Sequence, residues 1–206
     1  SFLNSRSRTF SAPIPIEVDK TLFPNKIWLW KITWHGPEGY ATIYENDRLS
    51  LVKTSDGLHY DLVTRLRCDS MPNETALLFG PNDELYLLVR REIGGATGVW
   101  GESRPPYTEW EWNDLGIRLG GPNLCALPDG SILIGSREVQ KEPHCGLYGL
   151  DGSKRAELLL RLPSGGDCSY PGFVVRGNTL WISYYSSHEG HRSEEHTSEL
   201  QSPRTI

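Results

Sequence analysis

Hydrophobic residues recur along the chain in short runs, and turns rich in glycine, proline, asparagine and aspartate separate these runs. Many of the runs alternate with polar residues or are continuously apolar, a pattern typical of β-strands. Clear examples are WLWKITW at 28–34, TEWEW at 108–112 and ELLLRL at 157–162. The last run lies between turn signals and is too short for a helix. The pattern therefore predicts an all-β chain.

One turn-and-strand pattern returns at a fixed spacing. It occurs at 81–92, and its turn residues Asp83, Gly130 and Gly177 are each 47 residues apart. A weaker copy at 36–46 is shifted by about three residues. Further strands flank each copy, which gives four strands in about 45–50 residues, the spacing of a β-propeller blade. We therefore expect a partial β-propeller over 1–191, with about four blades, some of them partial; a β-sandwich would not repeat in this way.

The 206 residues carry 21 Lys and Arg against 26 Asp and Glu, for a net charge of −5. This balance argues against a nucleic-acid partner, which requires a clustered basic face. No apolar run is long enough for a membrane span. Neither a metal-ligand spacing nor a phosphate-binding loop is found, so we expect no metal and no cofactor. Four cysteines are too few for a disulfide scaffold, and a Cys145–Cys168 bridge stays open.

The end of the chain has an unusual origin. Residues 192–202 read RSEEHTSELQS, which is similar to the in-frame translation of the standard adapter used in short-read sequencing. The continuation of the adapter accounts for 203–206. We therefore expect 192–206 to be a non-native, disordered tail on a gene fragment from assembled DNA, and we exclude it from reasoning about the fold. We also expect native sequence to be missing at both ends.

Several spaced residues could carry chemistry. Glu74 opens one strand of a repeat and Arg90 closes the next strand, 16 residues later. Arg137 ends the matching strand of the following repeat, and Tyr170 lies in GDCSYPGFV at 166–174. The order and spacing of these segments resemble those of sialidase-like propellers, which are six-bladed. The turn TSDGLHY at 54–60 resembles the structural Asp-box hairpin of the same family, and 150–153 resembles a degenerate copy.

The resemblance implies an exo-α-sialidase-type glycoside hydrolase acting on a glycan or small sugar, in a secreted or periplasmic location. Sialic acid carries a carboxylate, which would repel a carboxylate nucleophile, and sialidases use a tyrosine instead. The resemblance makes Tyr170 the nucleophile, Glu74 its base, and Arg90 and Arg137 the ligands of the substrate carboxylate. Further substrate contacts are expected from four residues at the blade edges: Asn123, Asp167, Tyr184 and His188.

Other interpretations stay open for each residue. Glu74 could be an exposed residue at a strand start, the arginines could belong to solvated ion pairs, and Tyr170 could be a packed aromatic. The protein could be a non-catalytic propeller that binds glycans or protein, or a glycosidase that pairs Glu74 with Asp167 or Glu189. Residues 1–26 contain no match to the arginine and the acid/base aspartate that the family carries in an N-terminal blade. We therefore expect this fragment alone to be inactive.

Overall fold

The computed structural model describes residues 3–4, 6–138, 143–187 and 193–201, and gives only the backbone for the last of these stretches. Its described part is built from β-strands, with a single turn of 3₁₀-helix at Ile93–Gly95. A short hairpin of β1 (Leu3–Asn4) and β2 (Thr9–Phe10) precedes the main sheets. The all-β prediction is confirmed.

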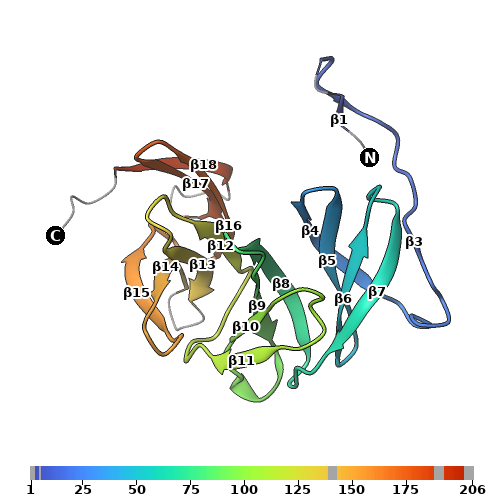
Figure 1. Ribbon diagram of the computed structural model, residues 1–206. Coiled ribbons are helices and arrows are strands. Elements are labelled where there is room, and N and C mark those ends of the chain that lie inside the picture. The colour runs from blue at the N-terminus through green and yellow to red at the C-terminus, as the bar shows by residue number, and fades with distance from the viewer. Residues whose placement is uncertain (1–2, 5, 139–142, 188–192, 202–206) are drawn as a thin grey trace.

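Four antiparallel sheets follow one another along the chain, and we number them blades 1 to 4 (Figure 1). Blade 1 has β4 (Trp28–His35), β5 (Glu38–Glu45), β6 (Arg48–Thr54) and β7 (His59–Leu66), with β3 (Glu17–Val18) added in parallel at its edge. Blade 2 has β8 (Pro72–Phe79), β9 (Leu85–Arg91), β10 (Val99–Ser103) and β11 (Glu111–Asp114). Blade 3 has β12 (Asn123–Ala126), β13 (Ile132–Glu138), β14 (His144–Leu150) and β15 (Ala156–Arg161). Blade 4 has β16 (Cys168–Arg176), β17 (Thr179–Ser186) and β18 (Ser193–Gln201).

The first strands of the blades lie next to one another. β8 contacts β4 on one side and β12 on the other, and β12 in turn contacts β16. In Figure 1 these strands lie toward a common centre, and the later strands of each blade lie farther out. Sheets arranged radially in this way define a β-propeller, so the predicted propeller fragment is confirmed.

The 47-residue repeat corresponds to the turn between the first and second strands of each blade. Gly36, Asp83, Gly130 and Gly177 occupy these turns, and all four have a positive φ of +59°, +61°, +85° and +56°. The predicted shift of the first copy was wrong, because Gly36 lies 47 residues before Asp83. A left-handed turn residue at one fixed position explains why glycine recurs there.

Most of the core lies between blades. One buried cluster joins blades 1 and 2 around Leu51 and Leu87, and a second joins blades 2 and 3 around Trp100 and Ile134. A third cluster joins blades 3 and 4 around residues that include Cys145 and Cys168. Each blade therefore buries its apolar faces against its neighbours, as a sheet that cannot form a core alone must do.

The tryptophans of β4 do not all lie on one face of the sheet, although the letters of WLWKITW alternate. A β-bulge inserts Lys31 between Trp30 and Ile32, so the alternation of side chains reverses at that point. Trp28 and Trp34 are 53% and 49% exposed, so both lie largely in solvent.

An aspartate and a left-handed glycine form the turn between the third and fourth strands of blade 1. Asp56 Oδ1 accepts hydrogen bonds from the backbone N–H groups of Leu58 and His59 at 2.8 and 2.9 Å, and Gly57 has a φ of +75°. In the corresponding turn of blade 3, Asp151 caps Ser153 and Arg155, while Lys154 takes the positive φ. The two aspartates are therefore structural.

The tail that we expected to be disordered is described over Ser193–Gln201 as strand β18, paired with β17. Backbone pairing of this kind needs no particular sequence, because an edge strand offers its N–H and C=O groups to any extended segment. The adapter origin of 192–206 stays a prediction.

Candidate functional site

Tyr170 and Glu74 meet at the centre of the blades, although 96 residues separate them. The Tyr170 hydroxyl donates a hydrogen bond to Glu74 Oε1 at 2.6 Å. Glu74 is buried, with 7% of the residue exposed, whereas Tyr170 is 44% exposed. The carboxylate is therefore held in the protein, and the phenol ring lies partly open to solvent.

Bulges in the first strands place these side chains. In β8 the register shifts between Pro72 and Thr75, around Glu74, and in β16 it shifts between Ser169 and Gly172, around Tyr170. Tyr170 also has a φ of +53°, which is unfavourable for a residue with a Cβ atom. Bulges redirect side chains, and strained backbone tends to occur at functional sites.

The second oxygen of Glu74 is also occupied. Glu74 Oε2 accepts hydrogen bonds from Arg90 Nη1 at 2.8 Å and from the backbone N–H of Gly121 at 3.1 Å. Arg90 forms a second ion pair with Glu92. Burial lowers the pKa of Arg90, but its bonds to the two carboxylates outweigh burial and raise it. Glu74 is thus a carboxylate fixed by three donors.

The surroundings of Tyr170 change the pKa of its hydroxyl group. Burial, followed by the hydrogen bond to Glu74 and the charge of that carboxylate, raises the pKa of Tyr170 to about 12, while Arg90 acts in the opposite direction. The hydroxyl therefore keeps its proton at neutral pH and points it at Glu74. A proton can pass along this bond when the phenol oxygen attacks an electrophile.

Arg137 lies beside this pair, on the other side of Gly120 and Gly121. Its backbone N–H donates to the carbonyl of Gly120 at 2.8 Å, and a Cβ atom at Gly120 would lie 2.9 Å from Arg137 Nε. Arg137 Nη1 lies 3.4 Å from Asp167 Oδ1, which also accepts a hydrogen bond from Tyr185 at 3.0 Å. The Tyr185 and Tyr170 rings are 6.1 Å apart, so Tyr185 links Asp167 to Tyr170.

Lys31 and Trp30 complete the site from blade 1, and the sequence did not identify either as a site residue. Lys31 lies at the β4 bulge, with a φ of +38°, and its Nζ donates to the carbonyl of Pro122 at 3.3 Å. Burial of the ammonium end lowers the pKa of Lys31, while the charge of Glu74 raises it. The Trp30 ring lies 6.3 Å from that of Tyr170, and Trp30 Nε1 is buried with no hydrogen-bond partner in the described residues.

The other residues that were predicted to contact the substrate do not all lie at the site. Asn123 Nδ2 donates to the carbonyl of Pro171 at 2.8 Å and so holds the segment that follows Tyr170. Tyr184 does not reach the site: it is 4% exposed, and its hydroxyl donates to the carbonyl of Pro163. Neighbouring strand residues point to opposite faces, so Tyr185 faces Tyr170 instead. His188 and Glu189 lie outside the described residues.

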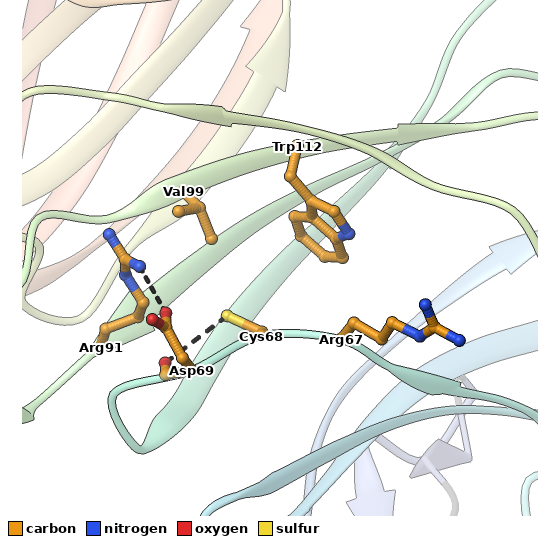
Figure 2. A pocket seen from close by; sticks show the side chains of 6 residues that line it. All are labelled: Arg67, Cys68, Asp69, Arg91, Val99 and Trp112. Atoms are coloured by element: carbon orange, nitrogen blue, oxygen red, sulfur yellow. Dashed lines mark hydrogen bonds and ion pairs between the residues drawn. The ribbon is translucent and has the colours of Figure 1, made fainter.

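A separate cleft of about 470 Å³ lies beside blade 2 (Figure 2). Its lining is mixed in charge and partly aromatic, and Figure 2 shows the Arg91–Asp69 ion pair at one end and Trp112 across from it. Because Arg90 and Arg91 are neighbours on one strand, their side chains leave the sheet on opposite faces. The cleft is therefore distinct from the Glu74–Tyr170 site. It is lined by Arg67, Cys68, Asp69, Arg91, Val99 and Trp112.

The described residues contain no group of three or more histidine, cysteine, aspartate or glutamate side chains that could hold a metal ion. The same part of the chain has no helix long and apolar enough to cross a membrane.

Comparison with known proteins gives the fold. A protein of unknown function from Dyadobacter fermentans matches 82% of this chain and 51% of its own, with 17% identity and a TM-score of 0.68. The xyloglucan-locus protein GH43B of Bacteroides ovatus matches 85% of this chain and 40% of its own, with 14% identity and a TM-score of 0.58. The exo-β-1,3-galactanase of Phanerochaete chrysosporium matches 77% and 43%, with 12% identity and a TM-score of 0.59.

These likenesses show the fold: the chain has the fold of the β-propellers found among GH43 glycoside hydrolases. The chain spans about half or less of the length of these three proteins. No protein-family model matches the sequence. No curated protein matches it either. The expected sialidase type does not appear among the three structures described above.

Proposed function

We propose that the chain is part of a propeller glycoside hydrolase in which Tyr170 is the nucleophile and Glu74 is its base. The observation that carries the proposal is the 2.6 Å hydrogen bond from the Tyr170 hydroxyl to Glu74, a carboxylate that Arg90 holds from its other side. A nucleophile in contact with a base that a third group orients is the usual arrangement in covalent catalysis.

The reaction would proceed by substitution at the anomeric carbon of the sugar. The Tyr170 oxygen forms a bond to that carbon while its proton passes to Glu74, and the bond to the leaving group breaks. The leaving oxygen takes a proton from a general acid. Water then attacks the anomeric carbon and gives a proton to the conjugate base of the general acid, while the bond to the Tyr170 oxygen breaks and Glu74 returns its proton to that oxygen. The resemblance assigns the general acid to an aspartate that 1–26 does not supply.

We further propose an acidic sugar, sialic acid or a relative, as the substrate. A tyrosine nucleophile suits a sugar whose own carboxylate would repel an aspartate or glutamate. Arg90, Arg137 and Lys31 supply three cations around the pair. The partner of Arg137, Asp167, has a side chain that is 54% exposed, so the ion pair is weak enough for a substrate carboxylate to replace it. Guanidinium groups bind planar carboxylates with two parallel hydrogen bonds.

A second candidate is a glycosidase for neutral sugars that uses Glu74 and Asp167 as its two carboxyl groups. Proteins of similar fold favour it, since they include a β-1,3-galactosidase and an exo-β-1,3-galactanase. Against it, Glu74 already accepts three hydrogen bonds, and all three would weaken if it lost its charge by protonation to act as an acid.

A substrate panel tests the two candidates. The protein from the complete gene that contains this chain would be assayed on aryl sialosides, aryl β-galactosides and aryl β-xylosides. The proposal predicts sialoside hydrolysis that Tyr170→Phe lowers by a factor of about 100 or more and Asp167→Asn lowers far less. Hydrolysis of neutral glycosides that survives Tyr170→Phe but not Asp167→Asn would favour the second candidate. Sugar binding without turnover by the folded protein would make it a non-catalytic binding propeller.

A further inference from the structure

Two of the four cysteines lie against each other across a blade boundary. Cys145 is near the start of β14 in blade 3, and Cys168 is the first residue of β16 in blade 4. Both are 0% exposed and belong to the buried cluster that joins these blades. Their side chains interact with each other, the Cys168 thiol donates to the carbonyl of Pro143 at 3.7 Å, and both cysteines are free thiols in the structure.

We propose that Cys145 and Cys168 form a disulfide that cross-links blades 3 and 4. In a disulfide the two Cβ atoms are about 3.8 Å apart, so thiols already in contact need little movement of the backbone. Both residues lie at strand ends, where small shifts disturb few ladder hydrogen bonds. The remaining cysteines have no such partner: the sulfurs of Cys68 and Cys125 lie near the backbone carbonyls of the residues that follow them.

The oxidation is a thiol–disulfide exchange with a small disulfide such as oxidised glutathione. One cysteine thiolate attacks the small disulfide, forms a mixed disulfide and releases one glutathione thiolate. The second thiolate then attacks the mixed disulfide at the first cysteine sulfur and releases the second glutathione. The protein loses two protons and two electrons, and oxidised glutathione becomes two molecules of reduced glutathione.

The local chemistry favours Cys168 as the attacking thiolate. The interaction with Cys145 lowers the pKa of Cys168, burial opposes this shift, and Ser164 and Arg137 add to it. The same contact, together with burial, raises the pKa of Cys145. A thiolate with a pKa near or below neutral reacts readily with disulfides once the blades open enough to admit one.

The disulfide would lie close to two residues of the candidate site, Tyr170 and Arg137, and would restrict their movement. Cys168 lies two residues before Tyr170, and Cys145 pairs with Arg137 in the register of β13 and β14. A disulfide between Cys145 and Cys168 would fix the segment that carries Tyr170 against the strand that carries Arg137. The inference stands independently of the proposed reaction, because the cross-link can be measured without any substrate.

The test uses the 206-residue chain, both folded and refolded from urea, in buffers of reduced and oxidised glutathione. Free thiols are alkylated, and the intact mass and the non-reduced peptides are measured. We expect two of the four thiols to be lost, a Cys145–Cys168 peptide pair, and a rise in Tm of about 5–10 °C over the reduced protein. Cys125→Ser is the matched control and should behave in the same way.

Cys145→Ser and Cys168→Ser should lose both the internal cross-link and the rise in Tm. If either variant fails to fold, the wild type and Cys125→Ser still decide the question by their peptide maps. Four alkylated thiols, glutathione adducts alone, or a cross-link that uses Cys68 or Cys125 would overturn the proposal.

Discussion

Replacing Glu74 by glutamine removes the charge that joins Tyr170 to Arg90 and changes the size of the side chain very little. The amide oxygen can take the place of Oε2 and keep the bonds from Arg90 and Gly121. The amide nitrogen then faces the Tyr170 hydroxyl, which loses its anionic acceptor. The carboxylate is buried and has three donors, so the structure predicts a measurable loss of stability.

The magnitude follows from these bonds. Hydrogen bonds to charged groups contribute about 1.5–3 kcal/mol and neutral ones about 1 kcal/mol, so the charge adds about 1 kcal/mol to each bond. With three bonds to Glu74, we expect Glu74→Gln to lower the free energy of unfolding by about 3 kcal/mol and Tyr170→Phe to lower it by about 1.5 kcal/mol. The double variant should lose about 3.5 kcal/mol, since the charge contribution to the shared bond is lost only once, which leaves a coupling of about 1 kcal/mol.

Urea denaturation of the four proteins, followed by tryptophan fluorescence, measures this cycle. Glu92→Gln is the matched control. Glu92 shares Arg90 with Glu74, but its side chain is 34% exposed, so its loss should be below about 1 kcal/mol. Equal losses for Glu74→Gln and Glu92→Gln, or strictly additive effects at Glu74 and Tyr170, would refute the reasoning.

Two further predictions concern the backbone and pH. Gly121 has a φ of +56°, and a Cβ atom there would lie 2.3 Å from Ser169 Oγ, so Gly121→Ala should lower the free energy of unfolding by about 2–3 kcal/mol. Gly130 has open space around it, so Gly130→Ala should lower it by only about 1 kcal/mol. Similar losses for the two variants in urea titrations would contradict this prediction. The hydrogen bond and charge of Asp56 raise the pKa of His59 in the folded protein. The ion pair therefore stabilises the fold at pH values below the pKa that His59 has in the unfolded chain. This stabilisation is lost as the pH rises through the pKa of His59 in the folded protein. Tm measured between about pH 6 and about pH 8 should therefore fall more for the wild type than for His59→Gln, and parallel curves would argue against it.

The repeat was visible in the sequence because each blade needs the same left-handed turn between its first two strands. Asp83, Gly130 and Gly177 revealed the spacing, and Gly36 obeys it as well. The places of Glu74 and Arg90 on adjacent strands were also visible in the sequence, but the ion pair between them was not predicted. The contact with Tyr170 followed only from the resemblance, because it depends on how blades 2 and 4 meet.

The sequence did not predict the parts of the site that depend on bulges or on contacts between distant strands. Lys31 enters the site through a bulge, and a single inserted residue leaves no mark in the alternation of a run as apolar as WLWKITW. Tyr185 could have been found: Ile182 and Ser186 are buried, so alternation along the strand turns Tyr184 inward and Tyr185 outward. The exposure of Trp28 could not be deduced, because it depends on the neighbours of β4 in space.

The most direct measurement of the central claim is to trap the covalent intermediate. The protein from the complete gene would be incubated with a fluorinated sialyl fluoride, whose glycosyl-enzyme intermediate is hydrolysed slowly, and its peptides would be analysed by mass spectrometry. The account predicts one sugar attached to Tyr170, and no adduct on Tyr170→Phe. A sugar attached to Asp167 or to another carboxylate, with Tyr170 unmodified, would contradict it.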